Sequence, residues 1–199
     1  MKRRTLDIIF SIGGLALAVL ILVLGLVLQN QANFAKSYVH DQLSAQQITF
    51  TPADKLAPDT QAQCLINNGG QPLVTGKQAE CYANEYIAVH LSATDDGKTY
   101  SQASSDNQAL QAQIKADPNN ADLQAQQKVV AAKVDTLFKG ETLRGLLLTS
   151  YGFSIFGERA AQAALVAFLA AGVLFLASIA GLIHAFTTDK DRKVLVAEG

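Results

Sequence analysis

The sequence lacks most of the local features that reveal what a protein does. None of its 199 residues is Trp, and the chain has one Met, two Cys and four Pro. Lys and Arg number 16 and Asp and Glu 17, so no excess of positive charge favours a nucleic-acid partner. Nucleophile elbows, Walker loops, dinucleotide fingerprints and haem-attachment motifs are all absent. We therefore predict no catalytic residue, no metal site and no cofactor.

Two long apolar stretches stand out against this background. Residues 8–28 form an uncharged run of about 21 residues, which as a helix spans about 31 Å and matches a hydrocarbon core of about 30 Å. Residues 160–186 form a second run, in which Gln162 and His184 are the strongly polar members. Both are predicted to be transmembrane helices. A cleaved signal peptide is the alternative for the first run, but such runs are usually about 7–15 residues long and end at a small-residue cleavage site.

The distribution of basic residues predicts the orientation. Three basic residues precede the first span and three follow the second within residues 190–193. This distribution predicts a protein of the plasma (inner) membrane with both termini in the cytoplasm. The expected organisation is a cytoplasmic N-terminus at 1–7, a first span at 8–28, an extracytoplasmic domain at 29–159, a second span at 160–186 and a cytoplasmic tail at 187–199.

The region between the spans is predicted to be one small, mostly helical domain. Apolar residues recur at helical spacing from residue 34 to residue 43, so the first span is expected to continue outward as a stalk. Gly and Pro then mark a loop region up to about residue 74. Thr75 and Gln78 have the Thr-x-x-Gln pattern of a capping box, which predicts a helix from there to about residue 93.

A helical hairpin is expected to complete the domain. Its helices are predicted at 101–116 and 118–139, with Asp117 as the N-cap of the second helix, Pro118 at its first position and Gly140 as its C-terminal cap. The expected fold class is therefore an all-α membrane protein, in which two transmembrane helices with both termini inside flank a small, mostly helical extracytoplasmic domain.

Cys64 and Cys81 lie on the side of the membrane where thiols oxidise, and we predict a disulfide between them. It would close a loop of about 17 residues, which the chain-entropy estimate values at about 3 kcal/mol. A redox-active pair is the alternative, but the Cys-x-x-Cys spacing typical of such pairs is missing.

Small residues lie at four-residue steps along both apolar stretches. Because lipid supplies no hydrophobic drive between helices, such faces allow close backbone approach, and we expect them to pack the two spans together. Docking of a partner's helix is the alternative. The helix-packing residues expected on these faces are Gly14, Ala18, Ala163, Ala167, Ala171, Ala177 and Gly181.

Residues 136–159 lead from the polar region into the second span. Apolar and aromatic side chains with interspersed glycines surround Arg144, which predicts a short helix at the outer interface, with Arg144 reaching phosphate or pairing with Glu141. An ordinary helix buried in the domain is the alternative. The lipid- or partner-binding residues expected here are Arg144, Leu147, Tyr151, Phe153 and Phe156.

The three histidines belong to no recognised ligand or catalytic spacing. His40, His90 and His184 are far apart in the sequence, and we interpret the first two as half-exposed helix residues and the third as a headgroup-level residue. An acid/base site that uses His90 with Glu80 or Glu85 is the enzymatic alternative.

Two segments resemble a known family. TGKQAECYANEYIAVHL at 75–91 and DTLFKGETLRGLLLTSYGFSIFG at 135–157 are similar to the two recurrent blocks of an uncharacterised family of small actinobacterial membrane proteins with two transmembrane helices. The resemblance implies an actinobacterial plasma membrane and brings no activity, cofactor or binding residue with it.

The leading functional hypothesis is a non-enzymatic integral membrane protein, an accessory or scaffolding element of a larger envelope or respiratory membrane complex. The alternative is a lipid- or small-ligand-binding extracytoplasmic module or sensor. The expected partners are the lipid bilayer and either a membrane protein or a second copy of the chain, and no nucleic acid is expected.

Overall fold

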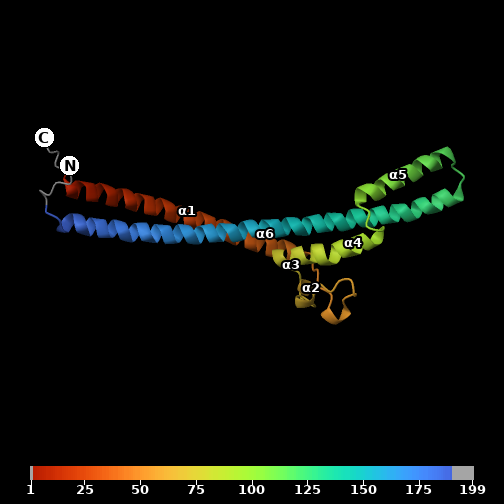
Figure 1. Cartoon of the computed structure of the whole chain (residues 1–199), viewed down its shortest axis with the longest axis horizontal. Coiled ribbons are helices and arrows are strands. Elements are labelled where there is room, and N and C mark those ends of the chain that lie inside the picture. Colours follow the sequence, from red (N-terminus) through yellow and green to blue (C-terminus); the bar gives the residue numbers. More distant parts are fainter. Residues whose placement is uncertain (1, 190–199) are drawn as a thin grey trace. The chain divides into compact units, whose positions relative to one another are not determined.

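The structure is a computed structural model that describes residues 2–189. It is 82% helix, and no strand is formed within those residues. Two helices dominate it, α1 at Arg3–Ala45 and α6 at Ala121–Thr187 (Figure 1). The shorter elements are η1 at Ala53–Lys55, α2 at Gln63–Asn67, α3 at Gly76–Cys81, η2 at Tyr82–Ile87, α4 at Ala88–Thr94 and α5 at Tyr100–Ala116.

Both long helices contain a window that is long and apolar enough to cross a membrane. The predicted all-helical class with two such helices is therefore confirmed. The chain divides into two compact units, of which unit 1 comprises Met1–Lys36 and Phe156–Gly199 and unit 2 comprises Ser37–Ile155. The helix expected to continue beyond residue 28 is also present, because α1 runs without a break to Ala45.

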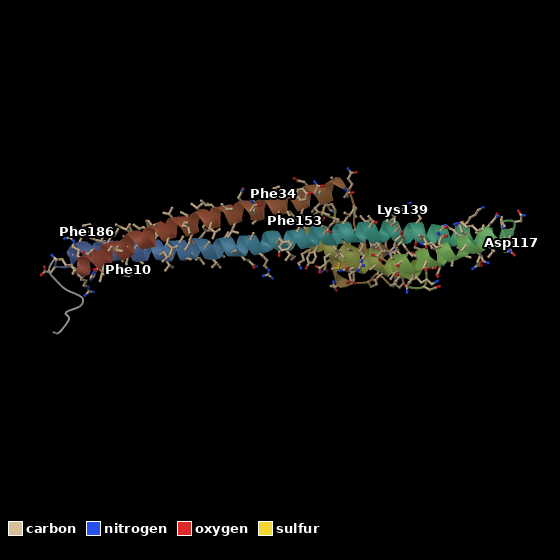
Figure 2. The ribbon with its side chains drawn as sticks, turned by 90° about the horizontal axis from the view of Figure 1, so that it is seen from above. Phe10, Phe34, Asp117, Lys139, Phe153 and Phe186 are labelled. Atoms are coloured by element: carbon tan, nitrogen blue, oxygen red, sulfur yellow. A yellow bond between two sulfur atoms is a disulfide. The ribbon has the colours of Figure 1, made fainter. Side chains whose placement is uncertain are left out.

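In unit 1, α1 and α6 lie side by side and antiparallel (Figure 2). Gly14 faces Ser178, Gly181 faces Ser11, and a Cβ atom added to Gly157 would lie 2.8 Å from the Cβ of Ala35. The inward positions alternate steps of three and four residues, the 3.5-residue repeat of a coiled coil. On α1 they are Ser11, Gly14, Ala18, Ile21, Gly25, Leu28, Ala32 and Ala35, and on α6 they are Ala164, Ala167, Ala171, Leu174, Ser178, Gly181 and Ala185.

The four-residue steps used for the sequence prediction place two of the seven packing residues outward. Ala163 and Ala177 are exposed, whereas Ala164 and Ser178 are buried. A four-residue step advances about 40° around an α-helix of 3.6 residues per turn, so a stripe drawn at that step leaves the contact face within a few turns.

In unit 2, α6 packs antiparallel against the continuous helical segment that α3, η2 and α4 form. Gly76 lies against Ser154, and a Cβ atom there would overlap the serine side chain. The buried core combines the end of α1, the loop that follows it with α2, the helices just named, and one residue of α5. Its members are Val39, Leu43, Phe50, Leu65, Leu73, Ala79, Cys81, Ala83, Ile87, Leu91, Ala103, Leu137 and Leu147.

The capping box predicted at Thr75 and Gln78 is present, and the helical segment that it starts ends at Thr94. A second capping box, which was not predicted from the sequence, starts α5 at Thr99 with Gln102.

The boundaries predicted for the second hairpin helix were wrong at both ends. Asp117 has a φ of −133° and a ψ of 81°, outside the helical region that residues before a proline avoid, and the helix begins at Ala121 instead. The side chain of Asn120 accepts a hydrogen bond from the Leu123 amide at 3.1 Å and so acts as the N-cap. At the other end Gly140 is no cap, because α6 continues through it and Leu91 packs where a Cβ would stand.

Candidate functional site beside the disulfide

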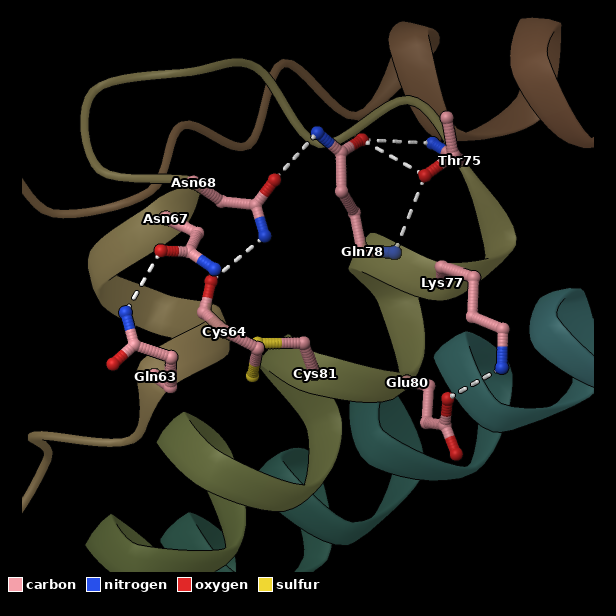
Figure 3. The surroundings of a disulfide bond; sticks show 9 residues. All are labelled: Gln63, Cys64, Asn67, Asn68, Thr75, Lys77, Gln78, Glu80 and Cys81. Atoms are coloured by element: carbon pink, nitrogen blue, oxygen red, sulfur yellow. Dashed lines mark hydrogen bonds and ion pairs between the residues drawn. A yellow bond between two sulfur atoms is a disulfide. The ribbon is translucent and has the colours of Figure 1, made fainter.

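The disulfide between Cys64 and Cys81 is present and joins α2 to α3 (Figure 3). The two Cα atoms are 6.1 Å apart, and the bond closes a sequence separation of 17. It anchors a loop whose apolar side chains already belong to the core, since Phe50, Leu65 and Leu73 are each at most 1% exposed. The bond and the buried side chains together hold the loop against α3.

A hydrogen-bond network fixes the same loop from the N-terminus of α3. The side-chain oxygen of Gln78 accepts from the backbone amides of Val74 and Thr75, at 2.9 and 3.0 Å. Its nitrogen donates to the Asn68 side-chain oxygen at 3.2 Å, and the Asn68 side-chain nitrogen donates to the Cys64 carbonyl at 2.7 Å. The amides of Gln78 and Asn68 are therefore committed to holding the loop.

A polar surface depression of about 440 Å³ opens beside the disulfide. Its walls come from α2 with the residue that follows it, the N-terminus of α3, and the first turn of η2. The lining residues are Cys64, Asn68, Thr75, Lys77, Gln78, Glu80, Cys81, Asn84 and Glu85. We call this feature the disulfide depression.

Lys77 links the disulfide depression to α6. Its ammonium donates to the Tyr151 hydroxyl at 3.3 Å, lies 4.9 Å from the centre of the Tyr151 ring, and is 3.5 Å from a Glu80 carboxylate oxygen. The hydrogen bond with Tyr151, and then the charge of Glu80, raise the pKa of Lys77. Lys77 therefore keeps its positive charge at the rim of the depression at neutral pH.

The π-helical turn η2 brings Glu85 onto the wall that carries Glu80. A π-helix closes its hydrogen bonds between residues five apart instead of four. Each residue therefore turns through a smaller angle about the helix axis than in an α-helix, and residues five apart lie closer to the same face. Residues 80 and 85 would lie about 140° apart on a regular α-helix of 3.6 residues per turn. In the structure both glutamates line the depression.

Of the residues predicted to bind lipid or a partner, four pack within unit 2 and one faces outward. Leu147 is 2% exposed in the core, and Tyr151 binds Lys77. The Arg144 guanidinium donates to the Asn84 side-chain oxygen at 3.2 Å and to Glu141 at 3.4 Å, which includes the pairing predicted from the sequence. The Phe153 ring packs edge-on against the Tyr38 ring at a centroid distance of 5.6 Å, whereas Phe156 is 74% exposed.

The stretch at 136–159 is not a separate interfacial helix. It lies inside α6, which is one helix over Ala121–Thr187, so the prediction of a short helix was wrong. Its glycines do not interrupt the helix, because an isolated glycine weakens an α-helix by only about 1 kcal/mol relative to Ala.

None of the three histidines lines the disulfide depression. His90 donates through Nδ1 to the Tyr86 carbonyl at 2.7 Å and packs on the Tyr86 ring at a centroid distance of 4.3 Å. His184 lies in unit 1, with its Nδ1 3.0 Å from the Asp7 carboxylate, and His40 is exposed on α1. Within residues 2–189 no group of three or more His, Cys, Asp or Glu side chains could hold a metal ion.

Comparison with protein-family models, curated proteins and solved structures finds no match for this chain.

The disulfide was predicted from the sequence, whereas the polar wall beside it was not. Lys77, Glu80 and Asn84 follow one another at steps of three and four along the helix that the capping box starts, and Cys81 lies among them. That spacing alone would have placed all three next to the disulfide. Glu85 is different, because the π-helical turn that moves it carries no clear sequence signal.

Proposed function

We propose that this protein is a non-enzymatic integral membrane protein that serves as an accessory or scaffolding element of a larger envelope or respiratory membrane complex. One observation carries the proposal. Only 17% of each apolar window is buried in the structure, so most large apolar side chains of the two windows face outward. Exposed apolar surface on this scale needs a cover, which a bilayer and the spans of a partner provide.

In this proposal α1 and α6 cross an actinobacterial plasma membrane, with both termini in the cytoplasm and residues 29–159 outside. The basic residues before the first span support this orientation, and so does the disulfide, which would persist in an oxidising compartment. The basic residues at 190–193 support it in the sequence but lie outside the described residues.

The orientation is tested by fusing alkaline phosphatase, which is active only outside the cytoplasm, after residue 97 or after residue 199. We expect activity from the first fusion and none from the second. Green fluorescent protein at the same two positions provides the reciprocal control. Activity at residue 199 would contradict the proposed topology.

The scaffolding role is tested by crosslinking and mass spectrometry on native membranes. The exposed Lys115 and Lys128 on the hairpin are suitable attachment points, because neither forms an ion pair within residues 2–189. We expect reproducible crosslinks from these lysines to one or a few membrane proteins. A chain that purifies in mild detergent as a monomer, with no crosslinked or co-purifying protein, would argue against the role.

A second candidate function is a small-ligand-binding module or sensor. The disulfide depression favours it, because its wall presents polar groups from a helix that a capping box and a disulfide hold in place. A lipid ligand is less well supported, since no large apolar side chain lines the depression and neither Phe153 nor Phe156 belongs to it.

A further inference from the structure

We propose that the disulfide depression binds a neutral, hydroxyl-rich ligand of the carbohydrate class. The inference deepens the second candidate function, and it rests on the proposed function only in placing unit 2 outside the membrane. There the depression would meet the glycans of a cell envelope.

The polar groups of the lining divide into those already committed to hydrogen bonds within the protein and those available to a ligand. The side chains of Thr75, Gln78 and Asn68 already form the hydrogen bonds of the capping box and of the network that holds the loop. Glu85 is exposed, and within residues 2–189 its carboxylate forms no hydrogen bond or ion pair. Asn84 uses its side-chain oxygen for Arg144, which leaves its NH₂ group available.

The available groups include both donors and acceptors. Asn84 offers two N–H donors, Glu85 offers carboxylate oxygens, and Glu80 binds Lys77 through only one of its two carboxylate oxygens. A ligand that fits must therefore accept some hydrogen bonds and donate others. Hydroxyl groups do both, whereas an ammonium group only donates and a carboxylate only accepts.

The charges of the lining disfavour an anionic ligand. Lys77 is paired with Glu80 and bound to Tyr151, so the carboxylate of Glu85 is left uncompensated and would repel an anion. A purely cationic group would be drawn to Glu85 but could accept nothing from the NH₂ group of Asn84. A neutral polyol meets no like charge. The volume of about 440 Å³ also falls within the range of about 300–1,000 Å³ that is typical of small-ligand sites.

The wall is held in shape before any ligand arrives. Arg144 fixes the Asn84 side chain from α6, and the capping box fixes the start of α3. Such support lowers the ordering cost of binding. We assign Arg144 as a positioning residue, because it acts on the site through Asn84 and does not line the depression.

The test is a binding measurement with full-length protein in detergent micelles. A panel of neutral soluble sugars that includes maltotriose and the N-acetylglucosamine trimer is compared with trilysine and triglutamate by saturation-transfer NMR and calorimetry. We expect one or more sugars to bind, and Glu85→Ala to weaken that binding at least about tenfold, as expected for losing a hydrogen bond to a charged group. Glu158→Ala, which removes an exposed glutamate of unit 1, is the matched control and should bind like the parent.

The proposal is overturned if the folded parent protein binds no sugar of the panel, or if either charged tripeptide binds more tightly than every sugar. It is also overturned if Glu85→Ala binds sugar as tightly as the parent, or if Glu158→Ala loses sugar binding to the same extent as Glu85→Ala. Each variant is first checked for an intact disulfide and an unchanged unfolding midpoint. Sugar binding without crosslinked partners would support the ligand site and contradict the scaffolding role. Crosslinked partners without sugar binding would support the scaffolding role and contradict the ligand site.

Discussion

At the scale of single residues, glycines distinguish contact positions from open ones along α6. A Cβ at Gly157 would press against Ala35, whereas nothing lies within 4 Å of the corresponding position at Gly172. Overpacking predicts that Gly157→Leu destabilises the α1 and α6 pair by about 1–3 kcal/mol. Gly172→Leu should be neutral or stabilising by up to about 1 kcal/mol, because Leu favours helix over Gly. Thermal unfolding in detergent measures both, and equal shifts would contradict the antiparallel packing.

Asp95 is the residue at which pH should act. It is 7% exposed, and the hydrogen bond from Lys133, at 2.5 Å, lowers the pKa of its carboxyl, with smaller contributions from the charges of Lys133 and Lys98. A carboxyl whose pKa is depressed by folding stabilises the protein above its unfolded pKa of about 3.9, and this contribution is lost as the pH falls through the folded value. We expect the unfolding midpoint to fall between pH 5 and pH 2, and less steeply in Asp95→Asn.

The control for the Asp95 experiment is Asp41→Asn, which removes an exposed carboxylate near the C-terminal end of α1 in unit 2. The parent and the control should share one pH profile. A profile for Asp95→Asn that matches theirs would show that the pair with Lys133 contributes nothing to the pH dependence.

At the scale of elements, the two capping boxes allow a paired comparison. Thr75 starts the helical segment that packs against α6 at Ser154, whereas Thr99 starts α5, whose only fully buried residue within Tyr100–Ala116 is Ala103. Thr75→Ala should cost about 1 kcal/mol of global stability, the usual effect of losing an N-cap. Thr99→Ala should mainly increase hydrogen exchange in the first turn of α5. Equal changes in global stability would show that α5 is as tightly coupled to the core as α3.

At the scale of the whole molecule, the disulfide is the one covalent link between distant parts of unit 2. Replacing both Cys64 and Cys81 by Ser should lower the free energy of unfolding by about 3 kcal/mol, because the unfolded chain regains the freedom of a 17-residue loop. Denaturant unfolding measures the loss. Dithiothreitol should lower the stability of the parent and leave the double variant unchanged.

The double variant is expected to stay folded, since Phe50, Leu65 and Leu73 remain buried without the bond. If dithiothreitol reduces the disulfide of the parent protein completely and the unfolding midpoint does not change, the stabilising role of the disulfide is contradicted.

Sequence patterns that depend on local composition predicted their elements well. The two apolar runs, the capping box at Thr75 and the continuation of α1 beyond residue 28 each follow from side chains within a few turns of one another. Features that depend on a second helix were predicted poorly. The error at Gly140 has this origin, because a glycine that ends a helix and a glycine that admits Leu91 from a neighbouring helix look the same in the sequence.

The sequence by itself determined that this chain is helical, has two stretches fit for a membrane, and carries one pair of cysteines able to join. Those properties arise from composition and short-range spacing. Only the tertiary structure decided that Ala164 faces inward and Ala163 outward, and that Glu80 and Glu85 share one depression. The physical reason is that both features depend on small rotations about a helix axis. Packing against a neighbouring helix determines the rotation in the first case and a π-helical turn determines it in the second, and local composition determines neither.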